Sequence, residues 1–215
     1  MQVCLASTSP ARLMLLRQAG IEPLTMAPDV DEDAVITEVE AAEGRRLDAD
    51  EHVLLLARRK AADVAAHVSA QNPGFDGVVI GGDSMFEIGG EILGKPHTAE
   101  IATRRWRAMR GSTGVLHSGH SVVRVRPAAG PTEAHAVAEA SVTFASDVTD
   151  AEIAAYVASG EPLHVAGAFT IDSLGGPFIE RVIGDPSTVV GMSLSTVRRL
   201  AGELGVSWPD LWNRA

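Results

Sequence analysis

The sequence predicts a protein of the α/β or α+β class, built on a sheet. Short apolar runs bounded by turn residues alternate with segments of helical periodicity, as expected when helices and strands interleave along a chain. Hydrophobic residues make up 46% of the 215 residues, enough for a sizeable core, and only 4% are aromatic, so aliphatic side chains are expected to fill it. The length indicates one domain or two tightly joined lobes.

The chain is expected to begin with a strand, a tight turn and a helix. The apolar run at 2–6 predicts a short buried strand. Ser9 is a favourable N-cap, Pro10 suits the first helical position, and Gly20 suits the C-terminal cap. The first helix is therefore expected between Pro10 and Gly20.

The middle of the chain continues this alternation. A second strand over 21–26 leads to an acidic loop, PDVDED, at 28–33, and the acid-rich residues 38–51 indicate a loop or a helical insertion. GVVIGG at 77–82 predicts a short buried strand with Asp83 at its end. Periodicity further predicts helices over 51–68, 98–109, 150–158 and 193–204, strands over 85–88, 120–125, 134–144 and 178–183, and a loop at 126–131.

Charge and cysteine content exclude several classes of function. The formal net charge of -10 argues against a nucleic-acid polymer as partner, but a small phosphorylated ligand needs only a local basic pocket. Cys4 is the only cysteine, which excludes an internal disulfide and a cysteine metal cluster and predicts a reducing, cytoplasmic setting. Neither a signal peptide nor an apolar run of about 20 residues is indicated, so no membrane partner is expected.

The segment Ser7-Thr8-Ser9-Pro10-Ala11-Arg12 is a candidate anion site between the first strand and the first helix. Unpaired N–H groups and the positive end of the helix dipole attract phosphate to a helix N-terminus. The serine hydroxyls add donors, and Arg12 adds a planar cation suited to phosphate oxygens. The alternative is an ordinary capped helix, because Ser-Pro caps are common.

Two acidic positions are candidates for metal binding and proton transfer. The cluster Asp31-Glu32-Asp33 could hold Mg²⁺ or Mn²⁺, which prefer oxygen ligands, or it could be a solvated turn. Asp83 follows a buried strand among glycines and apolar residues, where site residues are typical and where partial burial favours general-base work. A capping aspartate in the following turn is the alternative.

Two lysines are candidates for contacts to phosphate. In the basic run at 58–60, Lys60 is the candidate to face the sheet, and a solvated basic face is the alternative. Residues 89–95 fit G-x-x-x-x-G-K, the start of a P-loop, but the next residue is Pro96, which has no hydroxyl for Mg²⁺. The P-loop interpretation is therefore rejected, and Lys95 is left as a cation on a loop that Pro96 stiffens.

Taken together, these residues supply a phosphate cradle, an acid pair, a base and two lysines, which is the equipment of phosphoryl chemistry. Their order along the chain resembles the Maf family of nucleoside triphosphate pyrophosphatases. The stretches that carry the resemblance are LASTSPARLMLLRQAGIEP (5–23), DVDED (29–33), ARRKAADV (57–64), GGDSMFEIGGEILGKP (81–96), LHSGHSVV (116–123), HVAGAFTIDSLGG (164–176) and FIERVIGDPSTVVGMSL (178–194). Several motifs in the right order are more specific than any one of them, and the DSM variant resembles the actinobacterial branch.

The resemblance implies a fold and an activity. The implied fold is an elongated α/β fold over residues 1–215, a single domain with a central mixed β-sheet, flanking helices and two lobes around a cleft, shared with the inosine-triphosphate pyrophosphatases. The implied enzyme is a hydrolase of acid anhydrides that cleaves the α–β phosphoanhydride of canonical, non-canonical or modified nucleoside triphosphates, giving monophosphate and pyrophosphate. Mg²⁺ or Mn²⁺ is the implied cofactor, and members of the family are often homodimers.

The resemblance also implies roles for individual residues. By motif position, Asp83 is the proton acceptor and a metal ligand, and Glu32 is the metal-associated acid. The phosphate-contacting positions fall on Ser7, Ser9, Arg12, Lys60 and Lys95.

Three positions depart from the family pattern and bear on the choice of base. Ala11 stands where much of the family has arginine, Ser84 where threonine is frequent, and Asp172 where many members have glutamine. An aspartate at a base edge accepts hydrogen bonds from ring N–H or amino groups, which favours a guanine-type edge over a uracil edge.

Two other functions stay open at this point. A nucleotide-binding regulator of cell division and septum formation would need little catalysis, but the charged site positions are all filled here, which favours an enzyme for cleansing the nucleotide pool or for division control. A phosphotransferase that uses the same anion site is weakened by the broken P-loop.

Overall fold

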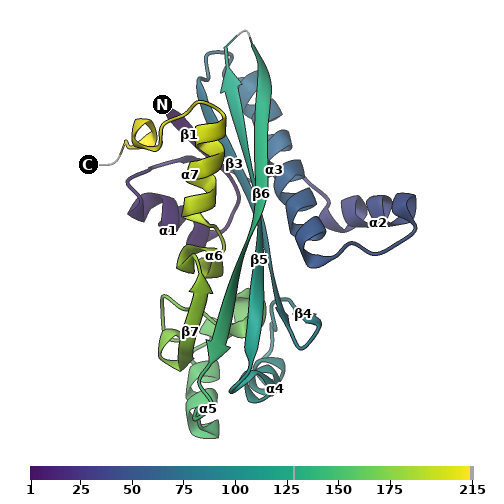
Figure 1. Cartoon of the computed structure of the whole chain (residues 1–215), viewed down its shortest axis with the longest axis vertical. Coiled ribbons are helices and arrows are strands. Elements are labelled where there is room, and N and C mark those ends of the chain that lie inside the picture. The colour runs from purple at the N-terminus through teal and green to yellow at the C-terminus, as the bar shows by residue number, and fades with distance from the viewer. Residues whose placement is uncertain (128, 214–215) are drawn as a thin grey trace. The chain divides into compact units, whose positions relative to one another are not determined.

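The computed structural model describes residues 1–127 and 129–213, and these form an α/β architecture (Figure 1). The strands are β1 (Gln2–Ala6), β2 (Leu24–Met26), β3 (Gly77–Ile88), β4 (Glu91–Leu93), β5 (Thr113–Arg126), β6 (Ala129–Phe144) and β7 (Ile179–Gly184). The α-helices are α1 (Pro10–Gln18), α2 (Glu32–Glu43), α3 (Ala49–Gln71), α4 (Ala99–Met109), α5 (Asp150–Ala158), α6 (Pro186–Val190) and α7 (Leu194–Glu203).

The seven described strands form one mixed sheet. Their order is β2-β1-β3-β5-β6-β7, and β4 pairs with β3 outside this path. β1 is parallel to both β2 and β3, whereas β4 is antiparallel to β3 and β7 is antiparallel to β6. The predicted α/β fold with a mixed sheet is confirmed. Among the described residues, none of the helices combines the length and the apolar character needed to cross a bilayer.

The chain divides into two compact units. Unit 1 consists of Met1–Asp83, Ser118–Ala138 and Gly191–Ala215, and unit 2 consists of Ser84–His117 and Glu139–Val190. The strands β3, β5 and β6 contribute residues to both units. The single domain with two lobes around a cleft stays a prediction.

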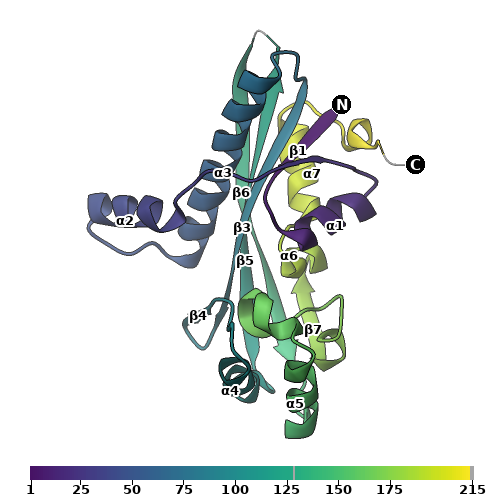
Figure 2. The ribbon, with the colours of Figure 1, turned by 180° about the vertical axis from the view of Figure 1, so that it is seen from behind.

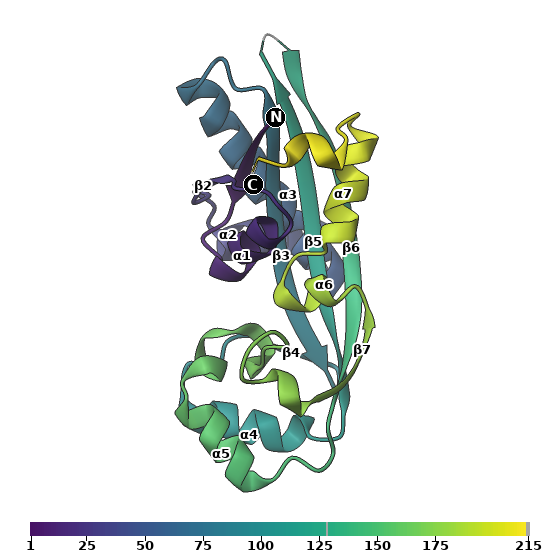
Figure 3. The same ribbon diagram turned by 90° about the vertical axis from the view of Figure 1, so that its left-hand side faces the viewer.

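Unit 1 has an aliphatic core, as expected from the composition. Figure 3 shows α3 and α7 on opposite sides of the strands of this unit. Ala61, Val64 and Val68 of α3 pack in one buried cluster with Val79 of β3 and Val123 of β5. The i, i+3, i+7 spacing of these helical residues explains why the segment forms a helix with one buried face.

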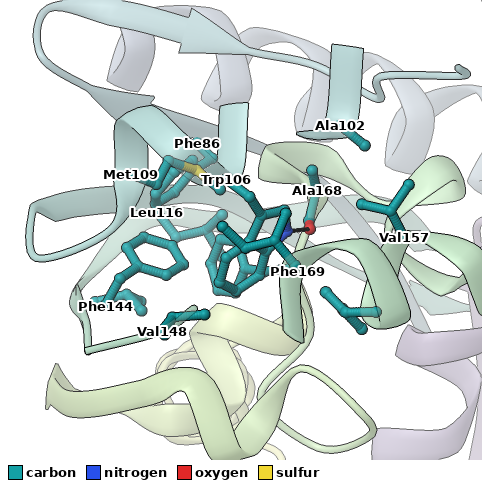
Figure 4. Packing of buried hydrophobic residues seen from close by; sticks show 13 residues of the cluster. Phe86, Ala102, Trp106, Met109, Leu116, Phe144, Val148, Val157, Ala168 and Phe169 are labelled. Carbon is teal, nitrogen blue, oxygen red and sulfur yellow. Dashed lines mark hydrogen bonds between the residues drawn. The ribbon is translucent and has the colours of Figure 1, made fainter. Parts of the chain in front are cut away.

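The buried core of unit 2, called the aromatic core below, combines five aromatic side chains with eight other apolar ones, so the expected aliphatic filling is only part of it (Figure 4). Trp106 of α4 is fully buried, and its ring meets those of Phe144 and Tyr156 edge to face at centroid distances of 5.4 and 5.3 Å. Its indole N–H donates to the carbonyl of Ala168 (2.7 Å). Such ring pairs contribute about 1 kcal/mol each beyond area burial. The few aromatic residues of the chain are therefore concentrated in this unit rather than spread.

The acidic segment at 28–33 is a loop, as the sequence suggested, only as far as Asp31, and its last two residues open a helix. The side chain of Asp31 accepts a hydrogen bond from the N–H of Ala34 (3.0 Å) and is the N-cap of α2, which begins at Glu32. Acids in a first turn are stabilised by the helix dipole, which explains this placement. α2 has no buried residues and lies beside the start of α3, away from the strands (Figures 1 and 2).

The segment around Asp83 is also different from its prediction. β3 continues without interruption from Gly77 to Ile88, so Asp83 lies inside a strand and not at the end of one. Pairing with β5, and with β4 at Phe86–Ile88, explains the longer strand, because sheet pairing overrides the weak strand propensity of Gly, Asp and Ser. The loop expected at 126–131 is shorter, since β5 ends at Arg126 and β6 begins at Ala129, and residue 128 lies outside the described residues.

Candidate functional site

The turn from Ser7 to Arg12, which joins β1 to α1, is held by its own side chains. Ser9 is the N-cap of α1, and its hydroxyl accepts a hydrogen bond from the backbone N–H of Arg12 (3.4 Å). The hydroxyl of Ser7 accepts from the N–H of Ser9 (3.1 Å) and from Nη1 of Arg12 (3.3 Å). An accepting hydroxyl keeps its own O–H as a donor. The Ser7–Arg12 turn therefore gathers O–H and N–H donors at a helix N-terminus, which is what an anion site requires.

The guanidinium of Arg12 is fixed by the C-terminal part of unit 1. Its Nε donates to the carbonyl oxygen of Gly191 (2.8 Å), 179 positions away in the chain. Burial lowers the pKa of Arg12, while the negative charges of Asp83 and Glu32 act in the opposite direction. These two carboxylates are therefore close enough to Arg12 to interact with its charge.

A cavity of about 240 Å³ lies beside the Ser7–Arg12 turn. It is lined by Ser7, Thr8, Ser9, Pro10, Leu13, Thr25 and Ala27. These side chains are apolar or carry hydroxyls, so the cavity offers shape and hydrogen bonds but no charged side chain among its lining residues.

Lys60 lies on the buried face of α3, as the helical pattern predicts. It is 7% exposed, whereas Arg58 and Arg59 point to solvent. Its ammonium nitrogen lies 2.8 Å from Oδ1 of Asp83 and 2.8 Å from Oε1 of Glu32. The Lys60 ammonium thus connects α3 to β3 and to α2.

Two consecutive glycines of β3 make room for these contacts. A Cβ atom at Gly81 would collide with the carbonyl oxygen of Ala57 and lie 2.8 Å from Cβ of Ala61, both in α3. A Cβ atom at Gly82 would lie 3.4 Å from Nε of Arg12. Because successive side chains of a strand point to opposite faces, Gly81 opens β3 toward α3 and Gly82 opens it toward the guanidinium.

The two units share the predicted site residues unequally. Unit 1 contains Ser7, Ser9, Ala11, Arg12, Glu32, Lys60 and Asp83. Unit 2 contains Ser84, Lys95 and Asp172. Within unit 1, hydrogen bonds join the serines to Arg12, ion pairs join Lys60 to both acids, and the charge interaction of Arg12 with those acids links the two groups.

The segment with the P-loop spacing is a hairpin. Gly89 and Gly90 have φ angles of 61° and 78° and form the turn between β3 and β4. No helix follows directly, since α4 begins only at Ala99. The rejection of a P-loop at 89–95 therefore agrees with the structure, and Lys95 is an exposed residue after β4.

Sequence reasoning missed three glycines of this site, Gly81, Gly82 and Gly191. The glycine pair before Asp83 was visible in the motif. The motif did not show that α3 packs against Gly81 or that the side chain of Arg12 lies beside Gly82. The carbonyl of Gly191 had no local signal at all, because it meets Arg12 through the folding of distant segments.

Asp83 and Glu32 fit the binding of a divalent cation. Both carboxylates converge on one ammonium, so their oxygens can also serve a different cation. Mg²⁺ and Mn²⁺ take oxygen ligands, and one or two protein carboxylates together with substrate phosphates form a common set. The chemistry of these donors therefore matches the metal that the sequence suggested.

Comparison with known proteins shows which family this chain belongs to. A family model described as Maf-like protein matches residues 2–204. A nucleoside triphosphate pyrophosphatase of Leifsonia xyli is 58% identical over 100% of this chain and 98% of its own length. Proteins with the same name from Rhodococcus jostii and Streptomyces avermitilis are 50% and 49% identical, over 97% and 98% of this chain and 94% of their own lengths. The chain belongs to the Maf-like family.

A solved structure is also similar at a low level. The Ham1 protein of Staphylococcus aureus aligns with a TM-score of 0.34 and 11% identity, over 68% of this chain and 73% of its own. A similarity of this size carries no argument here. The homodimer and the cytoplasmic location stay predictions.

Proposed function

We propose that this protein is a nucleoside triphosphate pyrophosphatase that hydrolyses the bond between the α and β phosphates. The observation that carries the proposal is the Lys60 ammonium at 2.8 Å from both Asp83 and Glu32, in the same unit as the Ser7–Arg12 turn. A base, a pair of acids and two cations beside a helix N-terminus suit phosphoryl transfer, in which positioning and charge neutralisation do most of the work. The names of the relatives support the same activity.

The residues of unit 1 bind the triphosphate. Arg12 holds phosphate oxygens through its guanidinium, with help from the hydroxyls of Ser7 and Ser9 and the N–H groups that open α1. Lys60 exchanges one of its carboxylate contacts for a phosphate oxygen when the substrate enters. From the family pattern, Lys95 is a further phosphate contact.

Asp83 is the general base of the proposed reaction. Its carboxylate accepts a proton from a water molecule whose oxygen attacks the α phosphorus. The bond from this phosphorus to the bridging oxygen breaks, and pyrophosphate leaves with the electron pair. Glu32 and Asp83 are the residues that would hold Mg²⁺ or Mn²⁺, which supplies positive charge against the phosphate oxygens when bound.

The choice of base depends on three residues in this proposal. Ala11, Ser84 and Asp172 are the positions that differ from the family pattern. The carboxylate of Asp172 accepts hydrogen bonds from ring N–H or amino groups, so guanine-type bases are preferred over uracil.

The test is a panel of ordinary and modified nucleoside triphosphates, each incubated with Mg²⁺, with Mn²⁺ or with a chelator. We expect monophosphate and pyrophosphate in equal amounts, with the metals and not with the chelator. Tight nucleotide binding without pyrophosphate would overturn the proposal in favour of a nucleotide-binding regulator of cell division. Label transferred from phosphate to an acceptor other than water would instead indicate a phosphotransferase.

A further inference from the structure

A carboxylate in unit 2 lies at the centre of a loop that the proposed chemistry does not explain. Glu161 follows α5 and accepts five hydrogen bonds, most of them from the loop at residues 170–175, the Thr170–Gly175 loop. Its Oε1 accepts from the hydroxyls of Tyr156 (2.9 Å) and Thr170 (2.5 Å) and from the N–H of Gly175 (3.1 Å). This oxygen therefore connects α5 with both ends of the loop.

The second oxygen of Glu161 holds the tip of the loop. Oε2 accepts from the hydroxyl of Ser173 (2.7 Å) and from the N–H of Leu174 (3.2 Å), although both of these residues are exposed. Hydrogen bonds to an ionised acceptor are shorter and stronger than neutral ones. Because these donors all favour the ionised carboxylate, they outweigh its burial and lower the pKa of Glu161 to about 2.

The two ends of the Thr170–Gly175 loop lie close together. A Cβ atom at Gly175 would lie 2.6 Å from the carbonyl oxygen of Thr170 and 2.6 Å from the hydroxyl of Tyr156. On the other side, Ile171 packs against the aromatic core of unit 2. Asp172 is exposed and lies in sequence between Ile171, which is anchored by packing, and Ser173, which is anchored by Glu161.

We propose that Glu161 is a positioning residue, which fixes the Thr170–Gly175 loop so that Asp172 presents its carboxylate to the nucleobase in one orientation. The inference rests on the proposed function, in which Asp172 reads the base. A group that is fixed before the ligand arrives loses little conformational freedom on binding, so discrimination between bases depends on the order of the loop. Glu161 itself acts through Asp172.

The first test measures the loop directly and needs no activity. In Glu161→Gln, an amide N–H₂ replaces one of the two accepting oxygens, so the N–H of Leu174 or that of Gly175 faces another donor. We expect amide hydrogen exchange at Leu174 and Gly175 to become about tenfold faster or more in this variant. The matched control is Glu152→Gln, which changes a glutamate of the same unit whose carboxylate, within the described part of the chain, accepts hydrogen bonds only from Thr149. Equal exchange at Leu174 and Gly175 in wild type and Glu161→Gln would overturn the proposal.

The second test measures the choice of base. The ratio of kcat/KM between the best and the worst of ATP, GTP, CTP and UTP is expected to shrink about tenfold in Glu161→Gln, through a higher KM for the best substrate, and to stay unchanged in Glu152→Gln. A lower kcat with an unchanged ratio would show a merely structural role and would overturn the proposal. If the wild type forms no pyrophosphate from any nucleotide, the proposed function is wrong, and the proposed recognition of the base by Asp172 is wrong with it. The hydrogen-exchange measurement still decides whether Glu161 fixes the loop.

A milder variant covers the case in which Glu161→Gln does not fold. Ser173→Ala removes one of the five hydrogen bonds and leaves the carboxylate in place. We expect faster exchange at Leu174 and a smaller base ratio, both in the same direction as in Glu161→Gln and about threefold in size. Unchanged exchange and an unchanged ratio in this variant would count against the proposal.

Discussion

The ammonium of Lys60 lies 2.8 Å from a carboxylate oxygen of Asp83, and both side chains are largely shielded from solvent. Lys60 belongs to the same face of α3 as the residues of the aliphatic core, so the packing of the helix fixes where the charge is placed. A shielded charge is stable only when it is paired, which makes these two residues dependent on each other. Predictions for this pair and its neighbours follow from that dependence.

Asp83→Asn is expected to keep the fold and lose turnover. Asparagine has nearly the same shape but cannot accept the proton, and general-base catalysis is worth about 10²- to 10⁴-fold in rate. The measurement is pyrophosphate release under saturating substrate. Asp33→Asn, an exposed position in the first turn of α2, is the control and should keep wild-type activity. Wild-type-like turnover in Asp83→Asn would refute its role as base.

Lys60→Met is expected to make stability depend on divalent cations. Without the ammonium, Asp83 and Glu32 repel each other, and since Glu32 is half exposed we expect a loss of about 2 kcal/mol. Mg²⁺ should restore part of this loss because it binds to the folded acid pair. Urea unfolding with and without MgCl₂ measures both effects. The control is Arg59→Met, one residue away on the exposed side of α3, which should neither lose stability nor respond to Mg²⁺. If Lys60→Met has the same stability as Arg59→Met with and without Mg²⁺, the ion-pair account is contradicted.

Arg12→Lys is expected to weaken substrate binding more than turnover. Lysine keeps the charge but cannot bond to the carbonyl of Gly191 and the hydroxyl of Ser7 together, as the guanidinium does. We expect KM to rise about tenfold, equivalent to about 1.4 kcal/mol. Arg17→Lys changes the same residue type on the same helix, where the partner is the exposed Glu22. Equal KM values for the two variants would exclude a special role for Arg12.

The stability contribution of Glu161 is expected to disappear in acid. Its pKa in the folded protein, about 2, lies below the usual 4.5, so folding favours the ionised form. The contribution is therefore complete above about pH 4.5 and is lost as the pH falls toward 2. Solvent screening limits its size, and we expect wild type to exceed Glu161→Gln by about 1–2 kcal/mol at pH 7. Urea unfolding of both proteins at pH 7, 4 and 3 measures the difference, and a constant gap would contradict this assignment.

Cys4 is expected to report folding in every variant. The thiol is buried in β1, and burial raises its pKa to about 11, so little thiolate is present at pH 8. Iodoacetamide should leave the native protein unmodified and should label it once in denaturant, as mass spectrometry would show. Rapid labelling of the native wild type would mean that β1 opens easily.

The parts of the fold that sequence predicted are those with local causes. The turn at Ser9 and Pro10 follows from capping chemistry, and the orientation of Lys60 follows from the spacing of apolar residues around it. The prediction of a loop up to residue 33 was wrong for Glu32 and Asp33, which begin α2. That helix has no buried residues, so the apolar periodicity that marks other helices is missing. The acids themselves were the available signal, since Asp31 is an N-cap.

The parts that sequence could not predict depend on distant segments. Asp83 lies inside β3 because neighbouring strands extend the pairing, and the aromatic core forms because rings from five segments meet in unit 2. The carbonyl of Gly191 and the bonds of Glu161 likewise appear only in three dimensions. For these residues the sequence shows the chemical group, and the fold determines its partner.

The two glycines of β3 have a consequence for the tolerance of this site to mutation. Alanine at position 81 would push α3 outward and withdraw the lysine from its aspartate, although no charged residue had changed. A survey of random variants would therefore find one added methyl group as harmful as the removal of a functional side chain.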